Sequence, residues 1–159
     1  MPSLADKLKS MGVNLGTEHL TPKPHAARLD FPIDNVISGE WQTTPHGEIF
    51  VVERYYADDF RQGSVPLRGD SPLEMVAAWA RQPELCELDL EQFVFIDTET
   101  TGLAGGTGTY TFMIGAGRFE GDQFRLAQFF LRDPAEELAQ LSAFEKFVAP
   151  CEAIVSFNG

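Results

Sequence analysis

The pattern of apolar and polar positions is clearest in the second half of the chain. Residues 93–96 form a short, continuous apolar run of the kind found in an interior strand of a sheet. Two further runs with the composition of strands, 110–119 and 123–131, are separated by a Glu-Gly-Asp turn at 120–122. A fourth apolar run follows at 153–157. We therefore expect three strands in an antiparallel meander and, after a helix, a fourth strand that returns to the same sheet.

The connecting helix is predicted to begin after residue 133. Asp133 is a suitable N-cap, Pro134 fits the first helical turn, and Glu136 completes a capping pattern. Pro150 ends the helical pattern because proline cannot continue a helix. Large apolar side chains recur at intervals of three and four residues and predict the face that packs on the sheet: Leu138, Leu141, Phe144 and Val148.

The first 90 residues are predicted to form an N-terminal region of short elements. Apolar spacing predicts a short amphipathic helix at 4–11, and three prolines indicate a linker at 17–32. A Pro-His-Gly turn between apolar and aromatic runs predicts a β-hairpin at 41–56. Ser71 is a suitable N-cap for a helix that runs from Pro72 to about Arg81.

The composition fits a protein that folds around its own core, since 43% of the 159 residues are hydrophobic. No apolar run approaches the roughly 20 residues that a membrane span requires, so we expect a cytoplasmic protein without membrane contact. Cys86 and Cys151 lie far apart and outside any CxxC motif, which argues against a disulfide framework or a zinc site. We expect both to be buried apolar side chains.

The net charge of −12 and a pI near 4.5 oppose simple electrostatic binding to a nucleic acid. They do not exclude a nuclease that works with divalent ions, because the site of such an enzyme is itself built from carboxylates.

A pair of carboxylates, Asp97 and Glu99, follows directly after the apolar run 93–96. Residues two apart in a strand share a face, so the pair would lie side by side while Thr98 points away. Two adjacent negative charges with hard oxygen ligands suit Mg²⁺ or Mn²⁺, and phosphodiester hydrolysis with two metal ions uses such a pair. The alternative is that Asp97 ends the strand and Glu99 is an exposed side chain. An isolated Asp-x-Glu favours this alternative, whereas the order of elements around the pair favours a metal site.

A glycine-rich segment at 102–108 could suggest a phosphate-binding loop. No Gly-Lys-Ser/Thr follows it, and the next element has the composition of a strand rather than a helix. We expect these glycines to let the backbone turn tightly beside the carboxylates.

Residues 95–103 resemble the first motif of the DnaQ-like, or DEDD, superfamily of 3′-to-5′ exonucleases. Residues 105–110 and 128–134 resemble specifically its YprB-like branch, and 155–159 is similar to the start of that branch's second motif. The resemblance implies an α/β fold with an RNase H-like mixed sheet in residues 91–159, to which the N-terminal region adds a small hairpin and helix segment.

By this resemblance Asp97 and Glu99 would be the catalytic metal ligands, with Mg²⁺ or Mn²⁺ as cofactor. The substrate would be a nucleic acid, as a single strand or a 3′ end. The resemblance also assigns substrate-binding positions: Thr100, Thr101, Gly102, Leu103 and Asn158.

In the family a catalytic aspartate follows soon after the asparagine that Asn158 matches, and a third motif supplies a histidine or tyrosine and another aspartate. The sequence contains neither, so we expect an incomplete nuclease domain with little or no turnover by itself. A second polypeptide or self-association could complete the fold. A non-catalytic nucleic-acid-binding or pairing module, or an inactive fragment, are the alternatives.

Overall fold

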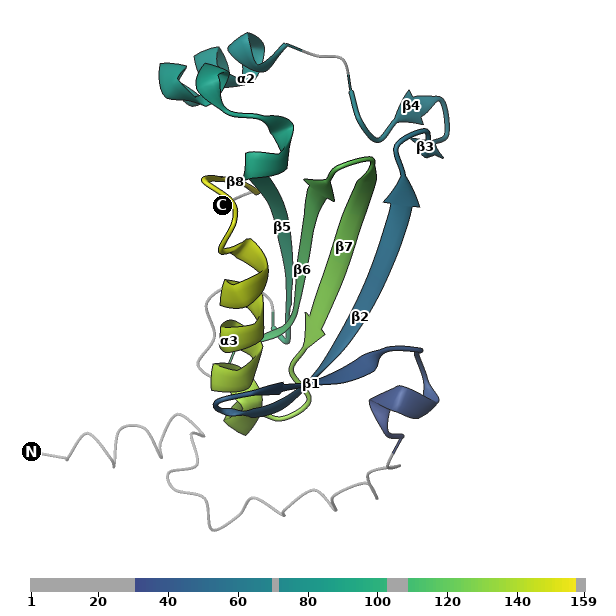
Figure 1. Cartoon of the computed structure of the whole chain (residues 1–159). Helices are drawn as coiled ribbons and strands as arrows, with labels where there is room; N and C mark the ends of the chain where they lie inside the picture. The colour runs from purple at the N-terminus through teal and green to yellow at the C-terminus, as the bar shows by residue number, and fades with distance from the viewer. Residues whose placement is uncertain (1–30, 70–71, 103–108, 157–159) are drawn as a thin grey trace, which may run out of the picture. The chain divides into compact units, whose positions relative to one another are not determined.

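The computed structural model of the chain describes residues 31–69, 72–102 and 109–156 (Figure 1). The predicted helix at 4–11, all but the last two residues of the predicted linker, Ser71, Leu103 and Asn158 lie outside the described residues. The fold belongs to a compact unit that begins at Pro32.

Within the described residues, six strands form one mixed sheet in the order β1-β2-β7-β6-β5-β8. All neighbours are antiparallel except β5 and β8, which are parallel. The predicted meander of three strands and the returning fourth strand are therefore confirmed, as is the α/β, RNase H-like fold class. The bounds are β1 Glu40–Thr44, β2 Gly47–Ala57, β5 Phe93–Thr100, β6 Thr111–Glu120, β7 Gln123–Phe130 and β8 Ala153–Ser156.

The predicted N-terminal hairpin is formed by β1 and β2, and it turns at Pro45 and His46. The Thr44 hydroxyl stabilises this turn by donating to the Gly47 carbonyl at 2.8 Å and accepting from the His46 amide at 3.1 Å. The sequence did not predict that β2 then pairs with β7, from Phe50 opposite Phe130 to Ala57 opposite Gln123. The pairing covers an edge that β7 would otherwise expose. The sheet therefore runs across the predicted division at residue 90.

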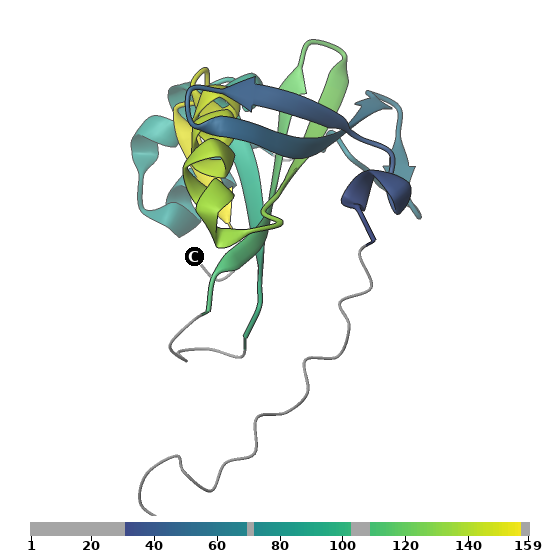
Figure 2. The ribbon, with the colours of Figure 1, turned by 90° about the horizontal axis from the view of Figure 1, so that it is seen from below.

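Helix α3 (Glu137–Val148) packs on one face of this sheet, beside the hairpin (Figures 1 and 2). It follows a 3₁₀ turn, η4 (Pro134–Glu136), in which the Asp133 carboxylate accepts from the Ala135 amide at 2.9 Å. The predicted cap is therefore present, but it caps the 3₁₀ turn that leads into the helix. The core between α3 and the sheet consists of Ile49, Val51, Val94, Ile114, Ala116, Ala127, Phe129, Ala139, Ala143 and Phe147.

The predicted buried face of α3 is wrong by about one residue. Leu138 and Leu141 are 60% and 46% exposed, whereas the buried residues are Ala139, Gln140, Ala143 and Phe147. Phe144 and Val148 are partly buried against the core. The two alanines let the helix backbone approach the sheet closely, and Phe147 supplies the bulk at its end. Gln140 is buried because its amide donates to the Phe129 carbonyl at 2.9 Å.

Shorter elements complete the described fold. Helix α2 begins at Leu73 with Pro72 as its N-cap, one residue later than predicted, and Arg81 adopts a left-handed conformation after it. Cys86 is exposed, so its predicted burial is wrong, and Cys151 is partly buried. No helix among the described residues is long and apolar enough to cross a membrane. The remaining elements are η1 Ile33–Asn35, β3 Arg61–Gln62, β4 Val65–Pro66, α2 Leu73–Ala80, η2 Pro83–Glu87 and η3 Leu90–Gln92.

Candidate active site

Strand β5 places the predicted carboxylate pair on the face of the sheet opposite to α3. Val94 is part of the core under α3, and Ile96 packs against that core. Because side chains alternate along a strand, Asp97 and Glu99 project from the other face, and both are exposed. The structure thus brings the two carboxylates side by side in the way that the sequence predicted.

A glycine faces Asp97 on the neighbouring strand. The register pairs Asp97 with Gly115 of β6, and Glu99 with Met113. A Cβ atom added at Gly115 would lie 3.6 Å from the Asp97 carbonyl oxygen, an ordinary contact, so the backbone there is not crowded. The side of Asp97 toward β6 is therefore free of any facing side chain.

This glycine also lies in a cavity of about 500 Å³ on the same face of the sheet. The cavity has Asp97 in its wall, and Phe95, Met113 and Leu126 supply apolar surface. Gln128 adds an amide whose Nε2 lies 3.4 Å from the Met113 sulfur. A carboxylate beside an apolar hollow can hold a cation and accommodate the apolar face of a bound molecule next to it.

Strand β8 lies on the other side of β5 and runs parallel to it, with Ser156 opposite Ile96. The carboxyl ends of parallel strands meet at one edge of a sheet, so Ser156, the last described residue of β8, lies near Asp97. Asn158, a predicted substrate-binding residue, comes two positions later but lies outside the described residues.

Thr100 is the last residue of β5, and Thr101 and Gly102 form the bend that follows it. A register irregularity separates Glu99 from Thr100. The Thr101 amide donates to the Tyr110 carbonyl at 3.1 Å, and the Thr101 hydroxyl accepts from the Tyr110 amide at 3.3 Å. The Thr100 hydroxyl donates to the Gly102 carbonyl at 3.2 Å. Both hydroxyls therefore hold the backbone in place beside the carboxylates.

The pair fits part of a divalent metal site. The described residues contain no group of three or more His, Cys, Asp or Glu side chains that could hold a metal ion. Asp97 and Glu99 nevertheless offer hard oxygen ligands on one exposed face, and Mg²⁺ commonly keeps several waters while binding only one or two carboxylates. The two residues can thus supply part of a coordination shell.

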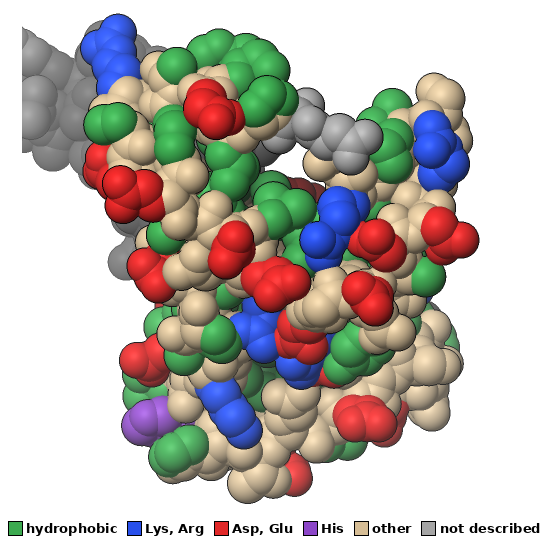
Figure 3. Space-filling view, turned by 45° about the horizontal axis from the view of Figure 1, so that its top comes forward, with side chains coloured by type: hydrophobic (Ala, Val, Ile, Leu, Met, Phe, Trp, Pro, Cys, Tyr) green, Lys and Arg blue, Asp and Glu red, His purple; other side chains and the backbone are tan. Residues whose placement is uncertain are grey.

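Sequence reasoning missed a second group of charged side chains, on the α3 face of the sheet. Arg118, Glu120, Arg125 and Glu53 form a chain of ion pairs across β6, β7 and β2. Partial burial alone would raise the pKa of Glu120, but hydrogen bonds from Arg118 and Arg125 outweigh it and hold that pKa below its ordinary value. Acidic and basic side chains are also interspersed on the face shown in Figure 3. The alternation Arg118-Phe119-Glu120 was the signal in the sequence that two charged side chains share one face of a strand. Their partners on β7 and β2 depend on the strand register, which the sequence does not give.

Comparison with known proteins bears on the region that contains the carboxylate pair. Residues 94–159 match the family model described as the "RNase_H superfamily". The chain is also similar to "Uncharacterized protein YprB" of Bacillus subtilis (strain 168), with 38% identity over 65 residues. That segment is 41% of this chain and 16% of the relative, so the chain spans only a small part of the relative's length. The family model confirms the predicted RNase H-like character, and the relative confirms the predicted likeness to YprB.

Proposed function

We propose that this chain, which is RNase H-like and similar to YprB over part of its length, takes part in metal-dependent 3′-to-5′ exonuclease hydrolysis of nucleic acid. The RNase H-like likeness supports nucleic-acid hydrolysis as a general activity. The 3′-to-5′ direction of the hydrolysis is part of our proposal. The observation that carries the proposal is the pair Asp97 and Glu99, exposed on one face of β5 with Gly115 opposite.

In this proposal Asp97 and Glu99 hold Mg²⁺ or Mn²⁺. Bound ions of this kind supply an activated water and stabilise the leaving oxygen during phosphodiester hydrolysis. The negative charges of the pair bind the ions, and Gly115 leaves room for a phosphate group beside Asp97. Residues 100–102, with Leu103 and Asn158, would position the terminal nucleotide of a single strand or a 3′ end.

Further residues outside this pair are required for turnover, and we propose that residues 91–159 act as the first half of the nuclease domain. A second polypeptide or self-association is one way to supply the rest. Sedimentation of the chain over a range of concentrations tests the self-association.

The direct test is Mn²⁺ binding to the full chain, measured by calorimetry, together with Mn²⁺-dependent release of nucleotides from a 3′-labelled single strand. We expect the double variant Asp97→Asn/Glu99→Gln to lose Mn²⁺ binding, and the unmodified chain to show little turnover. Asp122→Asn is the matched control, because it removes an exposed carboxylate in the turn of the same sheet. Wild-type Mn²⁺ affinity in the double variant would refute the site.

A second candidate is a nucleic-acid-binding module without catalysis. It is favoured by the described residues, which provide a carboxylate pair but no third metal ligand. Strand binding that persists without release of nucleotides at saturating Mn²⁺ would support this candidate.

A further inference from the structure

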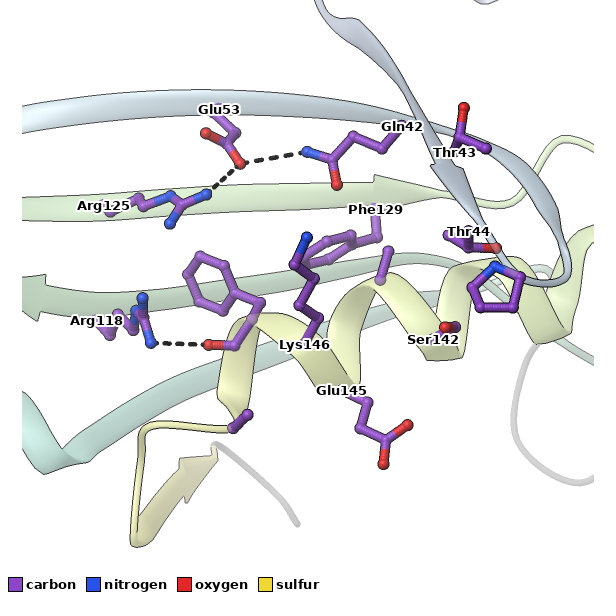
Figure 4. A pocket seen from close by; sticks show the side chains of 14 residues that line it. Gln42, Thr43, Thr44, Glu53, Arg118, Arg125, Phe129, Ser142, Glu145 and Lys146 are labelled. Carbon is purple, nitrogen blue, oxygen red and sulfur yellow. Dashed lines mark hydrogen bonds and ion pairs between the residues drawn. The ribbon is translucent and has the colours of Figure 1, made fainter.

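Three members of the ion-pair chain described above, Arg118, Arg125 and Glu53, line a cavity between the β1–β2 hairpin and α3 (Figure 4). Glu53 accepts from Arg125 at 2.7 Å and from the Gln42 amide at 3.5 Å. Arg118 donates to the Phe147 carbonyl at 2.9 Å. These bonds tie β1 and α3 to the sheet. The cavity on the opposite face, beside the carboxylate pair, contains a polar side chain that is less fully paired.

That side chain is Gln128, a polar residue on a face of β7 that is otherwise apolar. Side chains alternate along a strand, so the neighbours of Gln128 on this face are Phe124, Leu126 and Phe130. Gln128 is partly buried and lines the cavity together with Asp97. A polar group in such surroundings is stable only when it makes hydrogen bonds, to protein, water or a ligand.

The Gln128 amide is turned toward the carboxylate pair. Its Nε2 donates to the Met113 sulfur at 3.4 Å, and Met113 lies on β6 directly opposite Glu99. Gly115 of β6 is opposite both Asp97 and Gln128, and it has no side chain to separate them. The amide therefore faces the carboxylates across a single strand that leaves the space between them open.

The bond to Met113 satisfies only part of this amide. A glutamine side chain has two N–H donors and an oxygen with two lone pairs, and a thioether sulfur is a weak acceptor. The amide oxygen of Gln128 accepts no hydrogen bond from any residue that the structure describes. Phe95 and Leu126 provide apolar wall nearby. A donor for the amide oxygen must therefore come from water or a ligand inside the cavity.

The spacing of the strands indicates which donor fits. Adjacent strands are about 4.8 Å apart, so the backbones at Asp97 and Gln128 are separated by roughly 10 Å. This distance is too long for a direct hydrogen bond between the two side chains, and it suits a hydrated ion between them. Mg²⁺ usually keeps several waters when one or two carboxylates bind it. A water polarised by a divalent ion is a good donor to an amide oxygen.

We propose that Gln128 is a positioning residue of the metal site: its amide oxygen accepts a hydrogen bond from a water on the Mg²⁺ or Mn²⁺ ion that Asp97 and Glu99 hold. This inference rests on the proposed function, because it requires that ion. Gln128 thereby orients the water, as partners outside the coordination shell do in other metal sites. An amide performs this role without adding a third negative charge beside the pair.

The first test is calorimetric titration of the full chain with Mn²⁺. Gln128→Leu removes the amide and places an apolar side chain among apolar neighbours, so it should leave the fold intact and lower the Mn²⁺ affinity about tenfold. Gln128→Glu keeps an acceptor oxygen and adds a charge, so it should raise the affinity. Gln123→Leu is the matched control, because Gln123 is an exposed residue of the same strand outside the cavity. It should leave the affinity within about twofold.

A second measurement needs no change at position 128. In NMR spectra of the unmodified chain, Mg²⁺ should shift the side-chain amide signals of Gln128, and paramagnetic Mn²⁺ should broaden them because the ion is close. The side-chain amide of Gln140 is the internal control, since it is buried under α3 on the other face of the sheet and donates to the Phe129 carbonyl. Both effects on Gln128 should be absent in Asp97→Asn/Glu99→Gln.

The outcomes separate this inference from the proposed function. The role of Gln128 would be overturned, and the metal site would stand, if Mn²⁺ binding were lost in Asp97→Asn/Glu99→Gln but unchanged in Gln128→Leu. Side-chain amide signals of Gln128 that do not respond to Mg²⁺ would overturn the role in the same way. Absence of Mn²⁺ binding by the unmodified chain would overturn the metal site and the role of Gln128 together.

Discussion

Asp97 and Gly115 face each other across strands β5 and β6, and the glycine leaves the carboxylate without a facing side chain. The next glycine on β6, Gly117, lies opposite Phe95 and has a different role. A Cβ atom at Gly117 would collide with the Phe124 ring, so this glycine makes room for core packing. Two glycines of one strand therefore serve two purposes, one next to the carboxylate and one inside an aromatic cluster.

This difference predicts opposite results for the same substitution. Gly115→Ala should leave the free energy of unfolding within about 0.5 kcal/mol of wild type, whereas Gly117→Ala should lower it by about 1–3 kcal/mol through overpacking. Urea denaturation of both variants measures the two values. Equal destabilisation would show that Gly115 is also needed for packing.

Divalent metal should stabilise the folded chain through the carboxylate pair. A ligand that binds only the native state at about 100 times its Kd adds about 2.7 kcal/mol, which for a chain of this size raises Tm by roughly 5–10 °C. We expect this shift with Mn²⁺ in the wild-type chain and not in Asp97→Asn/Glu99→Gln. Thermal unfolding followed by circular dichroism measures it, and an equal shift in both proteins would place the metal elsewhere.

The features that the sequence predicted correctly depend on neighbours along the chain. The meander followed from apolar runs and from the turn residues Gly121 and Asp122, and Gly121 has a φ of +56°. The shared face of Asp97 and Glu99 followed from the alternation of side chains in β5. Each of these signals lies within one element or one turn, where local geometry decides the outcome.

The features that were missed depend on contacts between distant segments. The pairing of β2 with β7 sets Glu53 beside Arg125, and the register of β6 with β7 sets Arg118 directly opposite Arg125. Glu120 pairs with both arginines and Glu53 pairs with Arg125. These ion pairs offset the repulsion between the two positive charges that face each other. No motif in the sequence indicates such an arrangement. The facing of Asp97 and Gly115 likewise depends on the register between β5 and β6.

Helix α3 gives a direct test of its observed packing face. Phe147 is 5% exposed and packs against Phe129, with ring centres 5.9 Å apart. Phe147→Ala should therefore lower the free energy of unfolding by about 3–5 kcal/mol. Leu138→Ala changes a side chain that is 60% exposed and should cost less than about 1 kcal/mol. Chemical denaturation measures the loss of unfolding free energy in each variant. A larger loss in Leu138→Ala than in Phe147→Ala would support the buried face that the sequence predicted.

The ion-pair chain should make the stability sensitive to acid through Glu120. Burial raises the pKa of this carboxyl group, but the hydrogen bonds from Arg118 and Arg125 lower that pKa by a larger amount. The folded pKa therefore lies below the ordinary value of 4.5. A depressed pKa means that the unfolded chain takes up the proton first. The stabilisation by Glu120 is therefore present above pH 4.5 and is lost as the pH falls through the folded pKa. Because Glu120 is 35% exposed, solvent reduces the size of this effect.

We expect wild type to be more stable than Glu120→Gln at pH 7, and the difference to shrink steadily below about pH 4.5. Denaturation with urea at a series of pH values from about 7 to 3 measures this difference. Adding Arg118→Gln to both proteins should narrow the gap at pH 7, because it removes one of the hydrogen bonds that lower the pKa of Glu120. A gap that stays constant over the whole pH range would show that Glu120 contributes by packing and not by its charge.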